Sequence, residues 1–275
     1  MARDDDIHGA PVPAVFLHGI RLSGSMWGPV AGRVAAGRPV ATPDMPGHGS
    51  RRGERFTVEG AVQAVVDAID ALAPPGGGGR ALLVGISLGG YLGLAVAGRR
   101  PDRVAGLVAI GCSTQPRGVA VGAYRLLARG VSANPVWGDR LSAWGFRRML
   151  PPDVAQAMIA GGLDTAVMPD VVDALSGLDA LDELRRYPGP VWLVNGARDP
   201  FRAHESRFLA ACRDGRLQVW PGLDHLGCLG QTDRLVRLVD DAGAVVDRAA
   251  RPSTPADAAA LTVSEGEWSP PPRRG

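Results

Sequence analysis

The sequence predicts a doubly wound α/β fold, in which helices cover both faces of a mostly parallel sheet. Short apolar runs alternate along the chain with longer segments of helical periodicity. Strands of this kind are typical of parallel sheets that are buried on both faces. The alternation stops near residue 114 and resumes near residue 188, which indicates a helical insertion between two strands of the sheet.

Six short, mainly apolar segments are expected to form the strands. They are Ala14–Leu17, Pro39–Thr42, Ala81–Val84, Val104–Ile110, Val191–Val194 and Leu217–Trp220. Four segments are expected to form the helices of the sheet layers, namely Trp27–Ala36, Thr57–Leu72, Leu88–Arg99 and Thr232–Ala249. In Thr57–Leu72 the apolar side chains fall on one helical face, and Leu88–Arg99 is expected to stop before Pro101.

The expected insertion, residues 114–187, has helical stretches interrupted by prolines and an uneven charge. Its first half carries six arginines and one aspartate, whereas its second half is mainly acidic. We expect this insertion to form a helical cap on a core made of residues 1–113 and 188–250. Residues 251–275 are rich in Pro, Ala and Ser and are expected to lack fixed structure.

The composition sets further limits on function. The formal net charge is +2, too small to favour a nucleic acid or a membrane surface as a partner. Three cysteines show no disulfide or metal-ligand spacing, and the absence of lysine excludes Schiff-base chemistry. The polar start of the chain shows no signal peptide, and no apolar run approaches the ~20 residues that cross a bilayer. We therefore expect a soluble, cytoplasmic protein without a bound metal.

The motif G-x-S-x-G runs from Gly85 to Gly89 and places Ser87 between an apolar strand and a helix. Glycines two positions before and after the serine allow a sharp turn that holds its backbone in a strained conformation. Such a motif also arises by chance in a chain with 38 glycines, where it is most often only a turn. The flanking strand and helix favour Ser87 as a catalytic nucleophile.

A serine nucleophile needs a base, and the base needs an acid that orients it. Asp199 follows the fifth expected strand, and His225 follows the sixth. Because the carboxyl ends of parallel strands share one edge of the sheet, Ser87, Asp199 and His225 are expected to meet there. Asp199 could instead cap a helix. Asp224 is a rival acid, although a residue adjacent to the histidine is poorly placed to orient it.

The sequence assigns structural roles to several other residues near these motifs. His18 and His48 are expected to pack and to shape loops rather than to act as bases, and His204 is expected at the surface. Trp27 is expected to be a buried anchor at the start of a helix. These residues are therefore left out of the candidate site.

Together the motifs resemble those of the α/β-hydrolase superfamily over residues 13–249. The resemblance rests on the segments Leu17-His18-Gly19, Asp44-Met45-Pro46-Gly47-His48-Gly49-Ser50, Gly85-Ile86-Ser87-Leu88-Gly89-Gly90, Gly196-Ala197-Arg198-Asp199 and Gly222-Leu223-Asp224-His225-Leu226. It implies an α/β-hydrolase fold and an oxyanion hole formed by the backbone N–H groups of Ile20 and Leu88. It also implies a cap that gates the site. Arg21, near the oxyanion loop, is a candidate substrate contact.

Within the serine branch, the chain is similar to carrier-protein methyl ester esterases, enol-lactone hydrolases and the menaquinone-pathway lyase. It departs from many members in having only about a dozen residues before the first strand, where an antiparallel hairpin is usual. This difference leaves the three candidate catalytic residues in place but loosens the comparison of substrates.

The resemblance implies a serine hydrolase that cleaves a small-molecule carboxylic ester, thioester or lactone through an acyl-enzyme on Ser87. No metal or organic cofactor is expected. The expected partner is a small acyl substrate, and the arginines of the cap would suit an acyl carrier protein, although a solvated helix face is the simpler interpretation. The same triad could alternatively serve a lyase or cyclase by proton transfer in natural-product or quinone metabolism. A non-catalytic scaffold is disfavoured because no triad member is missing.

Overall fold

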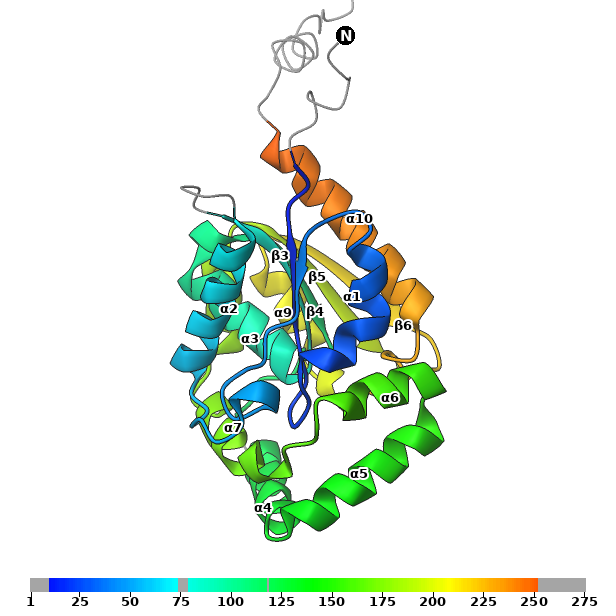
Figure 1. The fold of residues 1–275 in the computed structure, drawn as a ribbon. Coiled ribbons are helices and arrows are strands. Elements are labelled where there is room, and N and C mark those ends of the chain that lie inside the picture. The colour runs from blue at the N-terminus through cyan, green and yellow to red at the C-terminus, as the bar shows by residue number, and fades with distance from the viewer. Residues whose placement is uncertain (1–9, 74–78, 118, 252–275) are drawn as a thin grey trace, which may run out of the picture.

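The computed structural model describes residues 10–73, 79–117 and 119–251, which contain one six-stranded sheet (Figure 1). The strands lie in the order β2-β1-β3-β4-β5-β6, and all neighbouring strands are parallel. Their bounds are β1 Ala14–Leu17, β2 Val40–Ala41, β3 Ala81–Ile86, β4 Val104–Ile110, β5 Pro190–Gly196 and β6 Asp214–Trp220. The predicted parallel α/β sheet is confirmed, with a shorter edge strand β2 than expected. The tail predicted to lack fixed structure lies outside the described residues, apart from its first residue.

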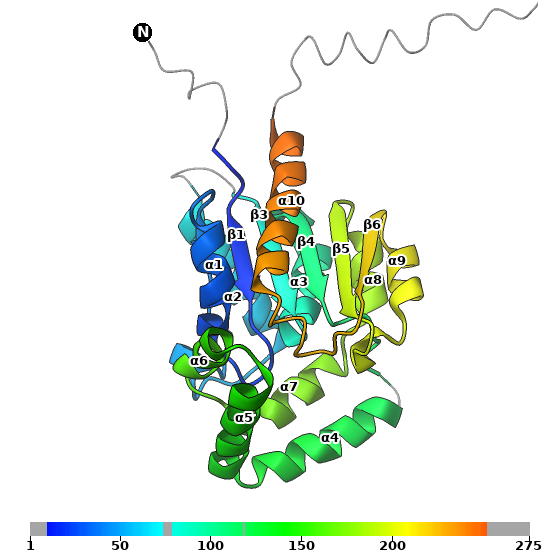
Figure 2. The ribbon, with the colours of Figure 1, turned by 90° about the vertical axis from the view of Figure 1, so that its right-hand side faces the viewer.

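Helices cover both faces of this sheet (Figure 2). On one face α1 (Gly28–Val34) packs against α10 (Thr232–Ala250). The other face is covered by α2 (Val58–Leu72), α3 (Leu88–Arg99) and α9 (Glu205–Ala211). This two-sided cover is the doubly wound arrangement that the sequence predicts.

The side chains of the central strand β3 show why its sequence is apolar throughout. Leu83 packs in the core beneath α2 and α3, whereas Leu82 and Val84 pack in the core beneath α1 and α10. All three side chains are fully buried. Because both faces of the strand are covered, neither set of alternating positions tolerates a polar residue. The sheet therefore fixes the loops at its carboxyl edge, where Ser87 lies.

Four helices lie at the end of the sheet where the strands terminate (Figures 1 and 2). They are α4 (Val119–Ser132), α5 (Pro135–Met149), α6 (Pro152–Ala160) and α7 (Met168–Leu175). A proline occupies the first turn of α5, α6 and α7. The prolines that we expected to interrupt helices thus begin them, because proline has the φ angle of a helix and no N–H that the first turn would leave unpaired. No described helix is long and apolar enough to cross a membrane.

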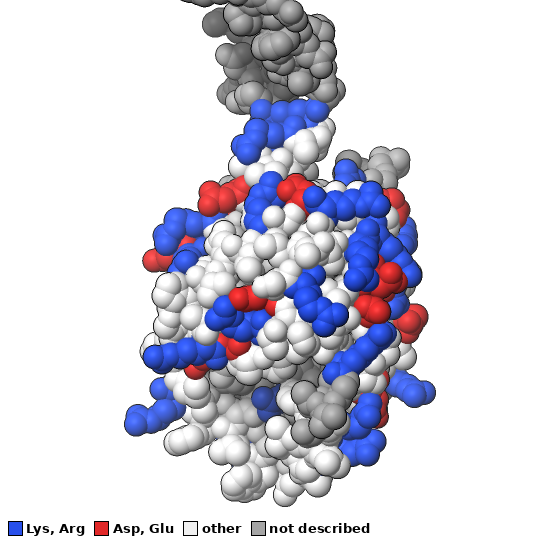
Figure 3. Space-filling view, turned by 180° about the vertical axis from the view of Figure 1, so that it is seen from behind, with Lys and Arg blue, Asp and Glu red and all other residues white. Residues whose placement is uncertain are grey.

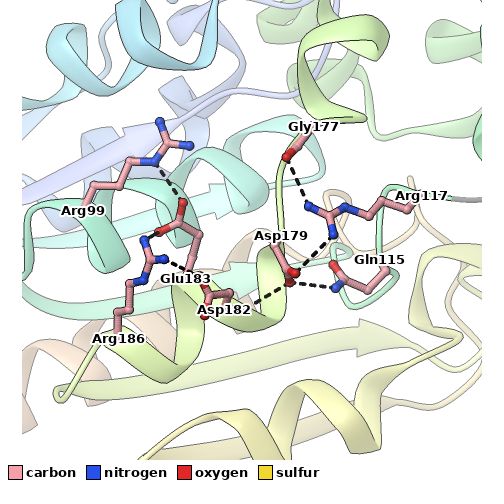
Figure 4. A network of polar contacts seen from close by, with 8 residues as sticks. All are labelled: Arg99, Gln115, Arg117, Gly177, Asp179, Asp182, Glu183 and Arg186. Carbon is pink, nitrogen blue, oxygen red and sulfur yellow. Dashed lines mark hydrogen bonds and ion pairs between the residues drawn. The ribbon is translucent and has the colours of Figure 1, made fainter.

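The last helix of the predicted insertion, α8 (Ala180–Arg186), packs against α3 on the face of the sheet. The two helices approach closely at Gly98, where a Cβ atom would lie 2.7 Å from the carbonyl oxygen of Glu183. Arg99 Nε donates a hydrogen bond of 2.9 Å to Glu183 Oε1 (Figure 4). The helices that lie over the carboxyl edge are therefore α4 to α7, and α8 is a helix of the sheet layers.

The two connections that lead into and out of these four helices are joined side by side (Figure 4). Gln115, after β4, donates a hydrogen bond of 3.0 Å to Asp179 Oδ1, and the Gln115 side chain accepts one of 3.2 Å from the N–H of Ala180. Arg117 forms an ion pair of 3.1 Å with Asp179 and donates to the Gly177 carbonyl. Asp179 also caps α8, so one carboxylate fixes both the connection and the helix start.

Candidate active site

Ser87 lies on a sharp turn between β3 and α3. Its φ and ψ are 53° and −118°, and only one other described non-glycine residue, Arg21, has a positive φ. A Cβ atom at Gly85 would lie 2.2 Å from the Gly89 carbonyl oxygen, and one at Gly89 would lie 2.1 Å from the Leu17 carbonyl oxygen. The turn therefore closes only with glycine at both positions. The backbone strain at Ser87 persists because the surrounding structure holds the residue in this conformation.

Asp199 and His225 are brought together from the loops after β5 and β6. His225 Nδ1 lies 2.8 Å from Asp199 Oδ2, and Asp199 Oδ1 accepts a hydrogen bond of 2.8 Å from the N–H of Phe201. The aspartate side chain is almost fully buried, whereas the imidazole is 22% exposed. With its Nδ1–H donated to the carboxylate, the neutral imidazole presents Nε2 as a proton acceptor. The Phe201 ring packs against the imidazole with centroids 4.8 Å apart.

The carboxylate of the rival acid Asp224 forms a hydrogen bond to a different partner. Its Oδ1 accepts a hydrogen bond of 2.7 Å from the N–H of Gly227, two residues beyond His225. That bond closes the turn after β6. The carboxylate hydrogen-bonded to the imidazole is the one on Asp199, and the two acidic side chains thus have different structural tasks.

Two of the histidines left out of the candidate site are buried and hold loops. His18 Nε2 accepts a hydrogen bond of 2.9 Å from the N–H of Met45, and Nδ1 lies 2.9 Å from the Gly19 carbonyl, to which it donates. The ring packs against His48 with centroids 4.9 Å apart. His204, which was expected at the surface, is partly exposed, and its Nδ1 accepts a hydrogen bond of 3.0 Å from the N–H of Gln115.

We expect acid to destabilise the fold partly through His18. Burial, reinforced by the neighbouring His48, lowers the pKa of His18 from 6.5 to about 4. Between these values the unfolded chain binds a proton that the folded chain excludes, so the free energy of unfolding falls as the pH decreases through this window. Urea unfolding at about pH 7 and pH 4 should show that the wild type loses about 1–3 kcal/mol more than His18→Gln, which keeps an acceptor for Met45. Equal losses in the two proteins would contradict this assignment.

The two predicted oxyanion-hole groups lie next to Ser87. Leu88 is the first residue of α3, where helix geometry leaves N–H groups without an intrahelical acceptor, and Ile20 lies in the turn that follows β1. Within residues 10–73, 79–117 and 119–251, neither N–H group donates a hydrogen bond. Both residues line a pocket together with Ser87. Two unpaired N–H groups beside a serine are the donors that an oxyanion requires.

Two adjoining pockets meet at Ser87. The first, which we call the α7 pocket, has a volume of about 250 Å³ and is lined mainly by apolar side chains, including Leu88, Tyr91 and Val171. The second, the α6 pocket, has a volume of about 240 Å³. Its lining includes Arg21, Phe146, Met158, His225, Leu226 and Leu229. The two pockets also share Ile20, Tyr124 and Phe201.

Arg21 is the charged side chain of the α6 pocket, apart from the imidazole. One guanidinium nitrogen donates a hydrogen bond of 2.6 Å to Ser142 Oγ, while the buried Nε has no partner among the described residues. No described carboxylate forms an ion pair with it. Burial lowers the pKa of Arg21. A half-buried cation with a free donor is suited to bind an anionic group of a ligand.

The sequence reasoning missed Gly111, which follows β4. Its φ is 58°, and a Cβ atom there would lie 2.8 Å from both Asp199 Oδ2 and His225 Nδ1. The absence of a side chain thus makes room for the pair. The signal in the sequence was a glycine at the end of a strand, but nothing there indicates what the glycine faces. Trp27 was placed correctly, because it is buried against Phe16 with ring centroids 5.3 Å apart.

Known proteins resemble this chain along nearly its whole described length. The model of the alpha/beta hydrolase family matches residues 14–240. A pimeloyl-[acyl-carrier protein] methyl ester esterase from Aromatoleum aromaticum is 30% identical over 82% of this chain and 96% of its own length. A thermophilic esterase from Thermogutta terrifontis has a TM-score of 0.70 at 20% identity, over 87% of this chain and 92% of that one. An enol-lactonase from Burkholderia xenovorans has a TM-score of 0.67 at 19% identity, over 85% and 92%. The chain is therefore an enzyme of the alpha/beta hydrolase family.

Proposed function

We propose that the protein is a serine hydrolase that cleaves a carboxylic ester, thioester or lactone through an acyl-enzyme on Ser87. The observation that carries this proposal is the hydrogen bond between Asp199 and His225, because His225 lines the same pocket as Ser87. The esterase named among the relatives supports an ester as the bond that is cleaved. Its name suggests an acyl group on a carrier protein as one form of the substrate, which the assays should include.

In the proposed reaction, His225 Nε2 takes the proton of the Ser87 hydroxyl as Oγ attacks the substrate carbonyl. The N–H groups of Ile20 and Leu88 donate to the oxygen of the tetrahedral intermediate. His225 then protonates the leaving group, and the C–O or C–S bond breaks to leave an acyl-enzyme. Water attacks that ester by the same steps in reverse, and Asp199 holds the imidazole in one tautomer throughout.

In this proposal the two sides of the substrate's carbonyl carbon, the leaving group and the acyl chain, occupy different pockets. The group that leaves must lie where His225 can protonate it, and His225 lines the α6 pocket only. The acyl chain would then occupy the α7 pocket, beside Leu88. The residues that line the α7 pocket include no charged side chain, which favours an apolar acyl group.

Hydrolysis in water labelled with oxygen-18 tests this proposal. A panel of esters, thioesters and lactones, including an acyl-carrier-protein ester, would be offered to the protein and the products analysed by mass spectrometry. The proposal predicts one labelled oxygen in each acid that is formed, because water attacks the acyl-enzyme. Turnover of a substrate without incorporation of label would instead support proton transfer by a lyase or cyclase.

We further propose that Arg21 binds an anionic group on the leaving side of the substrate. Arg21→Gln should lower kcat/KM about tenfold to a hundredfold for esters with a carboxylate in the alcohol portion, since a hydrogen bond to a charged group is worth about 1.5–3 kcal/mol. The same variant should hydrolyse uncharged p-nitrophenyl esters nearly as well as the wild type. Arg21→Lys, which keeps the charge, should lose less on the charged esters. An equal loss on charged and uncharged esters would show that Arg21 has only a structural role.

A further inference from the structure

The exposed large hydrophobic side chains of the described residues are confined to one end of the molecule. All seven lie between residues 126 and 149. Leu126 and Leu127 belong to α4, and the other five belong to α5. We call this surface the cap face. Figures 1 and 2 show α4 and α5 at the end of the molecule opposite α10.

On α5 the exposed apolar side chains form a stripe. Trp137, Leu141 and Trp144 are spaced by four and three residues, which places them on one side of the helix. The two tryptophans are each 64% exposed, and Leu141 is 53% exposed. The buried residues of the helix are Gly138 and Phe146. The stripe thus faces away from the body of the molecule. Its large apolar side chains are not buried by the fold, so they do not stabilise the folded chain.

Arginines accompany this stripe without acidic partners. Arg140, Arg147 and Arg148 are exposed, and none forms an ion pair or hydrogen bond within the described part of the chain. The single acid of α5, Asp139, accepts a hydrogen bond of 3.1 Å from the N–H of Thr165. Figure 3 shows this end of the molecule, at the bottom, as largely uncharged, with basic side chains beside it. The net charge of +2 conceals this local excess, because it averages over the whole chain.

We propose that the cap face docks onto an anionic lipid surface. Tryptophan is favoured at the boundary between headgroups and acyl chains, and each arginine near an anionic leaflet contributes about 1 kcal/mol. A second copy is disfavoured as the occupant, because a symmetric contact through this face would bring the unpaired arginines of both copies into one interface. An acidic protein could use the same tryptophans and arginines, and the absence of binding to anionic vesicles would favour it over a lipid surface. The inference concerns the cap face and does not depend on the chemistry at Ser87.

Docking would place the active site close to the lipid surface. Tyr124 of α4 lines both pockets, and Leu126 and Leu127, two and three residues further along the helix, are exposed on the cap face. A substrate that dissolves in the bilayer would then reach Ser87 by a short path past α4. Binding would be peripheral, since no described helix can span a bilayer.

Vesicle flotation of the full chain tests the proposal. Phosphatidylcholine vesicles with phosphatidylglycerol should bind the protein about a hundredfold more tightly than vesicles of phosphatidylcholine alone at low salt, from three arginines. Binding should also shift tryptophan fluorescence to the blue. The double variant Trp137→Ala/Trp144→Ala and the triple variant Arg140→Gln/Arg147→Gln/Arg148→Gln should each lose at least about tenfold in affinity.

A matched control removes three other exposed arginines, which lie on α9, before β6 and on α10. Arg207→Gln/Arg213→Gln/Arg237→Gln changes the net charge equally but should bind vesicles like the wild type. All variants should hydrolyse a water-soluble ester at the wild-type rate, which also shows that they fold. Three results would overturn the proposal: no binding to anionic vesicles, equal losses in the two arginine triples, or tryptophan-dependent formation of a dimer.

Discussion

Replacing Ser87 with alanine should lower kcat for ester hydrolysis by about a thousandfold to a millionfold. The variant keeps Asp199, His225 and the oxyanion donors but has no oxygen that can form an acyl-enzyme. Its Tm should change little, because the Ser87 side chain makes no hydrogen bond within the described residues. The smaller alanine side chain also fits where the serine side chain fits. Initial rates on p-nitrophenyl esters, measured together with thermal unfolding, check both expectations.

Ser113→Ala is the matched control for this substitution. Ser113 also lies at the carboxyl edge of the sheet, where it is fully buried, and its hydroxyl lies 3.4 Å from Asn195 Oδ1. It faces β5 rather than the pockets, so its loss should alter kcat by less than about threefold. Undiminished hydrolysis by the Ser87 variant would mean that another group attacks the carbonyl.

The second large effect is expected at Asp199. Asp199→Asn should lower kcat about a thousandfold to ten-thousandfold, as an amide in place of the carboxylate favours the wrong tautomer of the base. The fold should survive, because the asparagine oxygen can still accept the hydrogen bond from the N–H of Phe201. KM should change little, since Asp199 is buried behind His225 and lines neither pocket.

The neighbouring carboxylate provides the comparison. Asp224→Asn should keep kcat within about threefold of the wild type, because its side chain binds the N–H of Gly227 and not the imidazole. The two substitutions make the same chemical change on either side of one histidine. If Asp224→Asn lost more activity than Asp199→Asn, the acid would have been assigned to the wrong residue.

Much of the fold follows from patterns that depend only on nearby residues. The strand β3 and the helix α3 were predicted closely, because a fully apolar run and a proline stop are local signals. The two edge strands were predicted less closely, because β2 is shorter than expected and β6 begins at Asp214 rather than at Leu217. The placement of α8 on α3 could not be predicted, because it depends on the close contact at Gly98.

Some features of the candidate site also follow from nearby residues, whereas others depend on segments far apart in the sequence. The turn at Ser87 could be predicted because glycines two residues on either side are a local requirement of that backbone. The order of strand ends was enough to place Asp199 and His225 in neighbouring loops, and the position of Asp224 next to His225 already disfavoured it as the acid. The space at Gly111 and the unpaired donor of Arg21 depend on segments far apart in the sequence. Such features appear only when the chain is folded.

A fluorophosphonate probe measures the central claim most directly. The reagent reacts with a serine that a neighbouring base activates, and peptide mass spectrometry identifies the residue that carries the adduct. We predict a single adduct on Ser87 in the wild type, a rate of labelling that falls steeply in Asp199→Asn, and no adduct in Ser87→Ala. An active protein that leaves Ser87 unlabelled, or that carries the adduct on another residue, would contradict the proposed nucleophile.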